Sequence, residues 1–155
     1  MSIQQSGKAE FVDGILNTVS IFCSDTDFVP MYGVVTLSDG SLDDSVLLQK
    51  SFDEFYKNTR LTEIKEVEWT EDLKLIFDRW VIKCLSVPNN RFLSLPDHVE
   101  ALYDFLCEVI QGEKESNGIK AKHIQLSGGE WGYDAECLAV DDGEESYALY
   151  FMYSD

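Results

Sequence analysis

The feature that most constrains the fold is an alternation of apolar and polar residues that occupies the last quarter of the chain. A period of two residues is typical of strands that bury one face. Gly128-Gly129 separates the first run from the second, and Asp141-Asp142-Gly143 separates the second from the third. Asp-Gly between alternating apolar runs is a strong hairpin signal. The sequence therefore predicts a C-terminal three-stranded antiparallel meander, with strands over 119–127, 131–140 and 145–153.

Before residue 119 the apolar residues follow helical spacing. The clearest helix has Thr70 as its expected N-cap, and its apolar stripe consists of Leu73, Ile76, Phe77, Trp80 and Cys84. A second helix is expected to begin at Pro96 and to close at Gly112. Its inward face comprises Val99, Leu102, Tyr103, Leu106, Val109 and Ile110. A third helix is predicted over 42–58, with Ser41 as its N-cap.

Three shorter segments are less regular. Residues 9–23 carry a helical stripe of Phe11, Ile15, Val19 and Phe22, but Gly14 and the β-branched residues leave a strand as the alternative. Residues 28–37 predict a strand, and Pro30 would confine its early part to a sheet edge or a bulge. Residues 61–69 are interpreted as a short strand that ends at Trp69.

Helices followed by a meander predict a single α+β domain, with the helices packed on one face of a mostly antiparallel sheet. The domain is expected to span residues 9–155, after a flexible tail over 1–8. A chain of 155 residues, 45% of them apolar, can bury a core without a metal or a disulfide. We therefore expect the four cysteines to be buried free thiols: Cys23, Cys84, Cys107 and Cys137.

The net charge of −17 is unevenly distributed along the chain. Residues 50–122 are nearly balanced, with fourteen acids and eleven bases, whereas residues 123–155 contain eight acids and no Lys or Arg. A field of one sign repels nucleic acids and membrane surfaces and attracts basic proteins. The charge pattern thus argues against a nucleic-acid or membrane partner and favours a basic protein. Acidity that serves only solubility is the alternative.

No motif in the sequence assigns a catalytic residue, a cofactor or a metal. The glycine-rich segment 128–132 lies between two strands and opens no helix, so it does not fit a phosphate-binding loop. His98 and His123 have no neighbouring nucleophile and are interpreted as satisfied surface or boundary residues. The acidic stretch 141–145 lacks the ligand spacing of an EF-hand. A small enzyme with a site assembled from distant residues remains an alternative.

The candidate site is an acidic surface on the second and third strands of the meander, beside two aromatic residues. Aromatic anchors bordered by carboxylates suit the steering and binding of a cationic partner. The alternative is that the aromatic residues belong to the core and the acids to the solvated side of the sheet. The predicted partner-binding residues are Glu130, Trp131, Tyr133, Asp134, Glu136, Asp141, Asp142, Glu144 and Glu145.

In length, acidity and helix-then-meander order, and in the acidic segments 129–136 and 141–145, the chain resembles bacterial immunity proteins. The resemblance implies a cytoplasmic inhibitor whose carboxylates pair with Lys and Arg of a cognate toxin domain, often a basic nuclease. A mimic of the DNA backbone that inhibits a DNA-binding protein is an alternative, although the balanced middle of the chain argues against it. We expect no secretory signal or membrane span. The oligomeric state stays open.

Overall fold

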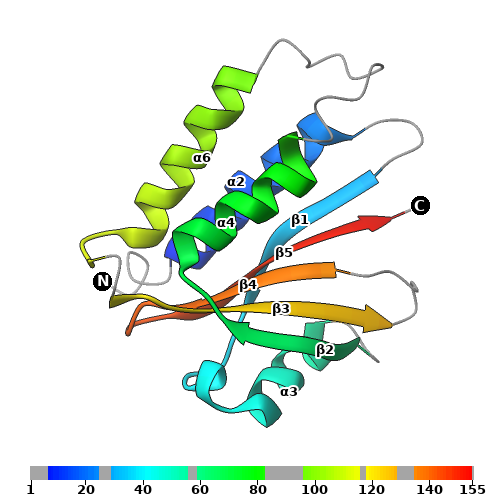
Figure 1. Ribbon diagram of the computed structural model, residues 1–155, viewed down its shortest axis with the longest axis vertical. Helices are drawn as coiled ribbons and strands as arrows, with labels where there is room; N and C mark the ends of the chain where they lie inside the picture. The colour runs from blue at the N-terminus through cyan, green and yellow to red at the C-terminus, as the bar shows by residue number, and fades with distance from the viewer. Residues whose placement is uncertain are drawn as a thin grey trace.

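The computed structural model describes residues 7–24, 29–55, 59–82, 96–115, 118–128 and 135–154. Their helical elements are α2 (Gly7–Cys23), the 3₁₀ turn η1 (Ser41–Asp43), α3 (Ser45–Phe55), α4 (Trp69–Phe77), the π-helical segment η2 (Asp78–Ile82) and α6 (Pro96–Gln111). The strands are β1 (Val29–Thr36), β2 (Thr59–Glu66), β3 (Lys120–Gly128), β4 (Ala135–Asp141) and β5 (Ser146–Ser154). They form one sheet in the order β1-β5-β4-β3-β2, and each neighbouring pair is antiparallel (Figure 1). The α+β class and the C-terminal meander are therefore confirmed.

The inner strand β4 is buried on both faces of the sheet, whereas most residues of the edge strand β2 are exposed. On β4, Leu138 and Val140 pack with α2, α4 and α6, whereas Cys137 and Ala139 point to the opposite face and pack with Leu48 of α3. Alternate residues of a strand point to opposite faces, so β4 reads as a nearly continuous apolar run. Figure 1 shows α2, α4 and α6 together on one side of the sheet and α3 apart from them. The prediction of a helical layer on one face did not include this second, smaller core.

The last hairpin turns at Asp141-Asp142-Gly143, as the sequence predicts. Gly143 has a φ of +90°, a backbone conformation that residues with a side chain rarely adopt. The strand before the turn ends at Asp141 and the next begins at Ser146. The predicted first turn at Gly128-Gly129 lies partly outside the described residues, because Gly128 still belongs to β3.

Residues 9–23 form a helix rather than a strand, but the helix buries a different stripe from the predicted one. The buried residues are Ala9, Val12, Leu16, Val19 and Cys23. Phe11, which belongs to the predicted stripe, is 52% exposed. Both stripes have helical spacing, so periodicity alone cannot decide which of them faces the sheet. The helix also begins at Gly7, so Gly7 and Lys8 belong to α2 and not to a tail.

The predicted N-cap residues of two helices were wrong. In each helix an acidic residue caps the N-terminus instead. Glu68, not Thr70, caps α4, because its carboxylate accepts the backbone N–H of Glu71 at 2.8 Å. In α3, Asp44 replaces Ser41 and accepts the N–H of Val46 at 3.0 Å. A carboxylate just before a helix satisfies N–H groups that have no partner within the helix.

The segment predicted as a strand over 61–69 is divided between two elements. The strand β2 ends at Glu66, and Trp69 begins α4. The helix continues into the π-helical η2, where Trp80 of the predicted apolar stripe is buried. Cys84, the last predicted member of that stripe, lies outside the described residues.

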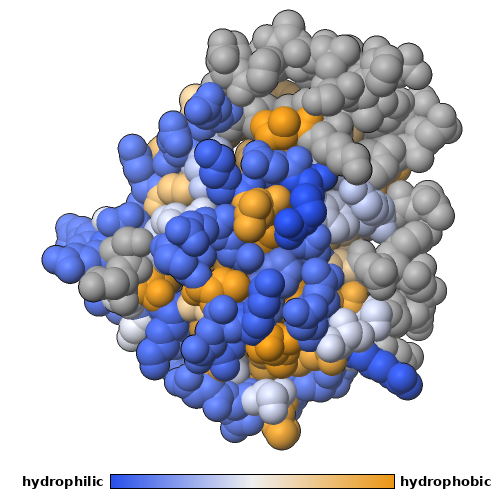
Figure 2. Space-filling model, viewed as in Figure 1, coloured by the Kyte–Doolittle hydropathy of each residue, from blue (hydrophilic) through white to orange (hydrophobic). Residues whose placement is uncertain are grey.

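The helix predicted from Pro96 to Gly112 agrees closely with α6. It spans Pro96–Gln111, and Gly112 follows it with a φ of +57°. Leu106 and Ile110 are fully buried. Of the described cysteines, Cys23 and Cys137 are buried free thiols and Cys107 is a partly buried one. The described surface in the view of Figure 2 is mainly hydrophilic, with hydrophobic residues in small separate patches.

Candidate functional site

The described members of the predicted partner-binding set fall into two separate groups. Glu130, Trp131, Tyr133 and Asp134 lie outside the described residues. Of the other five, Glu136 is near the start of β4, and the rest lie at the turn between β4 and β5. At about 3.3 Å per residue, the backbones of Glu136 and Asp141 are roughly 16 Å apart. The two groups therefore have to be described separately.

Glu136 is engaged inside the molecule. Its side chain is 13% exposed, and its carboxylate forms an ion pair with Arg79 of η2. The Arg79 Nε donates to Glu136 Oε1 at 3.0 Å, and the second guanidinium nitrogen donates to Oε2. The hydrogen bond with Glu136 raises the pKa of Arg79, against the opposing effect of burial. Glu136 therefore joins η2 to the sheet and is not an open contact for a partner.

The surroundings of His123 differ most from those predicted from the sequence. It is satisfied, as predicted, but it is buried (5% exposed) instead of lying at the surface or boundary. Its Nδ1 is 2.7 Å from Oδ2 of Asp72 on α4. Its Nε2 is 3.1 Å from the amide nitrogen of Gln125 and 3.4 Å from Glu136 Oε2. The imidazole is thus enclosed at both nitrogens and connects α4 with β3 and β4.

Asp142 is also turned inward. Its side chain is 3% exposed and lies 2.8 Å from Nζ of Lys8 on α2. The backbone N–H groups of Glu144 and Glu145 donate to its other oxygen at 2.9 and 2.8 Å. Burial by itself would raise the pKa of Asp142, but the hydrogen bonds from Lys8, Glu145 and Glu144 outweigh it and lower the pKa. Asp142 therefore holds the turn and attaches it to α2.

Glu145 has an intermediate position next to this pair. Burial raises its pKa, and the neighbouring charge of Asp142 adds to that effect, while Lys8 opposes it. Glu145 consequently gives up its charge more readily on acidification than an ordinary surface glutamate.

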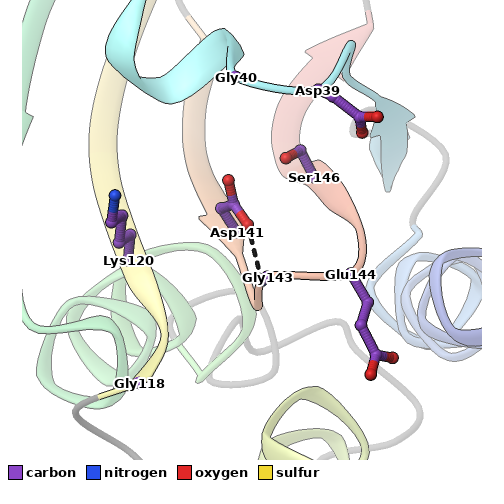
Figure 3. A pocket seen from close by; sticks show the side chains of 8 residues that line it. All are labelled: Asp39, Gly40, Gly118, Lys120, Asp141, Gly143, Glu144 and Ser146. Carbon is purple, nitrogen blue, oxygen red and sulfur yellow. Dashed lines mark hydrogen bonds between the residues drawn. The ribbon is translucent and has the colours of Figure 1, made fainter.

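Asp141 and Glu144 border an open hollow at the turn. Its volume is about 410 Å³, and its lining residues are Asp39, Gly40, Gly118, Lys120, Asp141, Gly143, Glu144 and Ser146. We call it the acidic hollow. Figure 3 shows Asp141 near its middle, with Lys120 on one side and Asp39, Ser146 and Glu144 on the other. The Asp141 carboxylate accepts the N–H of Gly143 at 2.8 Å, which fixes its position.

Lys120 is the cation that lines the acidic hollow. Its Nζ lies 3.6 Å from Oδ2 of Asp43 in η1. It also lines an adjoining hollow of about 310 Å³, together with Leu42, Asp43, Glu66, Val67, Ile119, Ala121 and Lys122. Carboxylates on two sides of a concave surface suit an ammonium or a guanidinium group of a bound molecule.

Asp39 was not among the predicted site residues. In the sequence it is only part of a turn, Ser38-Asp39-Gly40, far from the second turn at residue 141. The two turns meet because β1 pairs with β5, with Thr36 opposite Tyr147. Only the pairing of β1 with β5 places Asp39 beside the second turn, and this pairing cannot be read from a single sequence.

The described residues offer limited support for other chemistry. No group of three or more His, Cys, Asp or Glu within them is arranged to hold a metal ion. Burial raises the pKa of the thiols of Cys107 and Cys137, which keeps them protonated and weakly nucleophilic at neutral pH. No helix in the described ranges is long and apolar enough to cross a membrane.

Comparison of the chain with known protein families, with curated proteins and with solved structures finds no match.

Proposed function

We propose that the protein is an immunity-type inhibitor that binds a basic partner, such as the nuclease domain of a toxin, in the cytoplasm of a bacterial cell. The observation that carries this proposal is the acidic hollow, where Asp39, Asp141 and Glu144 border a concave surface lined by Lys120. Lys114 approaches Glu144 at 3.9 Å from outside the lining, and both of these side chains are exposed. A lysine or arginine of the partner would enter this hollow.

The charge of the whole chain supports the same kind of partner. The net charge is −17, and residues 123–155 contain no Lys or Arg. A field of this sign raises the rate at which a basic protein is encountered, by an amount that falls with ionic strength. The hollow would then fix the orientation of the complex, because the carboxylates lie on different elements: Asp39 beside η1, Asp141 on β4 and Glu144 in the turn.

Lys120 limits which cations the site would accept. It pairs with Asp43 at one rim, so an incoming cation must find a place on the Asp39, Asp141 and Glu144 side or displace Lys120. A guanidinium, which can bind two carboxylate oxygens at once, would suit this geometry better than an ammonium. The bound partner would be inhibited by occlusion of its own cationic site.

The test compares two charge-reversal variants with equal changes in net charge. Asp39→Lys/Glu144→Lys changes the hollow and leaves the Asp142–Lys8 pair and the Asp141–Gly143 hydrogen bond in place. Glu100→Lys/Glu108→Lys changes two exposed carboxylates of α6 and is the control. At low salt, the hollow variant should associate more than about tenfold more slowly than the wild type, and the control should be much less affected.

The binding probe is the basic C-terminal domain of the toxin that we expect the adjacent upstream gene to encode. Association and dissociation rates are measured at two salt concentrations. Equal rates for the two variants would show that only the net charge matters and would remove the hollow from the proposal. A domain that does not bind the wild-type protein would contradict the proposed function itself.

A further inference from the structure

The two edges of the sheet differ in how much of their backbone is covered. On the β1 edge, Asp13 of α2 accepts the N–H of Val34 at 2.8 Å. The helix is so close that a Cβ on Gly33 would lie 2.7 Å from the Asp13 carboxylate. On the β2 edge, none of the described helices follows the strand along its full length (Figure 1). The open backbone of the sheet is therefore on β2.

The first half of β2 is closed by α3. The side-chain amide of Gln49 donates to the carbonyl of Thr59 at 2.7 Å and accepts the N–H of Leu61 at 3.3 Å. A bulge between Leu61 and Glu63 then shifts the register. A bulge changes which residues point their backbone groups toward the neighbouring strand. The open part of the edge consequently begins at the bulge.

After the bulge, Ile64 and Glu66 present their backbone groups outward. Val67 donates its N–H to Ala121 of β3 at 3.3 Å, so the residues that face β3 are 67, 65 and 63. Because residues in an antiparallel strand alternate between the two sides, Ile64 and Glu66 face away from the sheet. Within the described part of the chain, neither of them has a hydrogen-bond partner on that outer side.

The side chains along this open segment are complementary to themselves. If two copies run antiparallel with Ile64 on the two-fold axis, Glu63 of each lies directly opposite Lys65 of the other. Ile64, which is 36% exposed, meets its counterpart. The outward N–H and C=O groups of Ile64 would form a pair of hydrogen bonds across the axis, and Glu66 would lie opposite Thr62. Opposite charges that face each other across two strands stabilise the pairing.

We propose that residues 62–66 of β2 pair with the same segment of a second copy, and so extend the sheet across a two-fold symmetric dimer. Charged edge strands usually resist pairing with other strands. Here the charges oppose pairing with a strand of another sequence. When β2 pairs with β2 of a second copy about Ile64, each Glu63 instead faces a Lys65 and the charges neutralise each other. Gln49 prevents the contact from extending past Leu61, so the interface is small and the dimer is weak.

The test is a charge swap, followed by sedimentation equilibrium at about 0.15 M salt, which screens the repulsion between the two acidic copies. The wild type should show a reversible monomer–dimer equilibrium below about 1 mM protein. The dimer contains two symmetry-related contacts between residues 63 and 65, so Glu63→Lys and Lys65→Glu each create two pairs of like charges. Each single variant should raise the dissociation constant of the dimer roughly tenfold or more. The double variant restores opposite charges and should restore the wild-type value.

A proline at Ile64 provides an independent check. Proline has no backbone N–H, and the N–H of residue 64 points away from β3. The hydrogen bonds between β2 and β3 should therefore remain, while the dimer is lost. The unfolding transition of Ile64→Pro confirms that the monomer is intact. A wild type that stays monomeric to about 1 mM, or a double variant no tighter than the single variants, would overturn the proposal. Neither result bears on the acidic hollow, which is lined by other residues.

Discussion

Asp142 and Glu144 are two residues apart, yet their carboxylates have opposite surroundings. Asp142 is buried, with a lysine and two backbone N–H groups as donors, whereas Glu144 is exposed and has Lys114 at 3.9 Å. A buried carboxylate with three donors is part of the fold, and an exposed one is free to meet a partner. The acidic residues of this turn therefore have two different surroundings, which the amino-acid type does not distinguish.

The ion pair between Lys8 and Asp142 predicts a pH-dependent effect on stability. Lys8→Met leaves the Asp142 carboxylate buried without its cation, and we expect a loss of about 1–2 kcal/mol of unfolding free energy at pH 7. The pKa of Asp142 is lowered from 3.8 in the folded protein, so its stabilising effect is present above that value and is lost as the pH falls below it. The difference between wild type and variant should therefore shrink below about pH 4. Urea unfolding at pH 7 and at pH 3 measures it.

Lys114→Met is the matched control for this prediction. Lys114 approaches Glu144 only at 3.9 Å and both side chains are well exposed, so the substitution should leave the unfolding transition unchanged. An equal loss for the two variants, or a Lys8→Met effect that does not change with pH, would contradict the assigned role of Asp142.

At the scale of elements, α4 is attached to the sheet by a polar contact as well as by its apolar stripe. Leu73 and Ile76 are fully buried against the sheet, and Asp72 on the same helix reaches His123 of β3. Apolar contacts alone allow a helix to rotate or slide by small amounts, whereas a buried hydrogen bond has one geometry. The Asp72–His123 pair thus fixes the position of α4 on β3.

Asp72→Ala should destabilise the protein by about 2–3 kcal/mol, because it leaves the buried imidazole without its acceptor. His123→Ala and the double variant complete a double-mutant cycle, in which thermal unfolding gives the coupling between the two residues. Glu71→Ala, at the next position on the exposed side of α4, is expected to have little effect. Additive effects of the two single substitutions would show that the contact is not energetically important.

At the scale of the whole molecule, the parts that the sequence predicted are those whose signal is local. The alternation around Asp141-Asp142-Gly143 predicts the last hairpin, and the stripe that includes Leu106 and Ile110 predicts α6, because each pattern lies within one or two elements. A local pattern does not determine which stripe of α2 faces the sheet, since two stripes with helical spacing overlap there.

The rest of the site depends on contacts between distant residues. Lys8 meets Asp142 and Asp72 meets His123 only because the helices dock on a sheet whose strand order is not the chain order. Before that docking is known, a buried aspartate and an exposed one look alike in the sequence. Of the predicted acidic surface, Asp142 and Glu136 are paired inside the molecule, whereas Asp141 and Glu144 border the acidic hollow, where binding of a partner stays a prediction.

Hydrogen exchange should report the same organisation. Leu138 and Ala139 of β4 and Leu149 of β5 are fully buried and lie on the inner strands, so their amides should exchange only through global unfolding. The outward N–H groups of Ile64 and Glu66 should exchange fastest in the sheet at low protein concentration. If the dimer forms, protection at Ile64 should rise with concentration, and exchange followed by NMR can measure both effects.

The position of β5 between β1 and β4 has a consequence for synthesis on the ribosome. Val29 pairs with Ser154, so β1 has no strand partner until almost the whole of this sequence has been translated. In the meantime its apolar residues, among them Tyr32 and Val35, can be covered only by α2, by other early segments or by a chaperone. The sheet is therefore expected to close late, with the slow, non-local pairing of β1 with β5 as the final step.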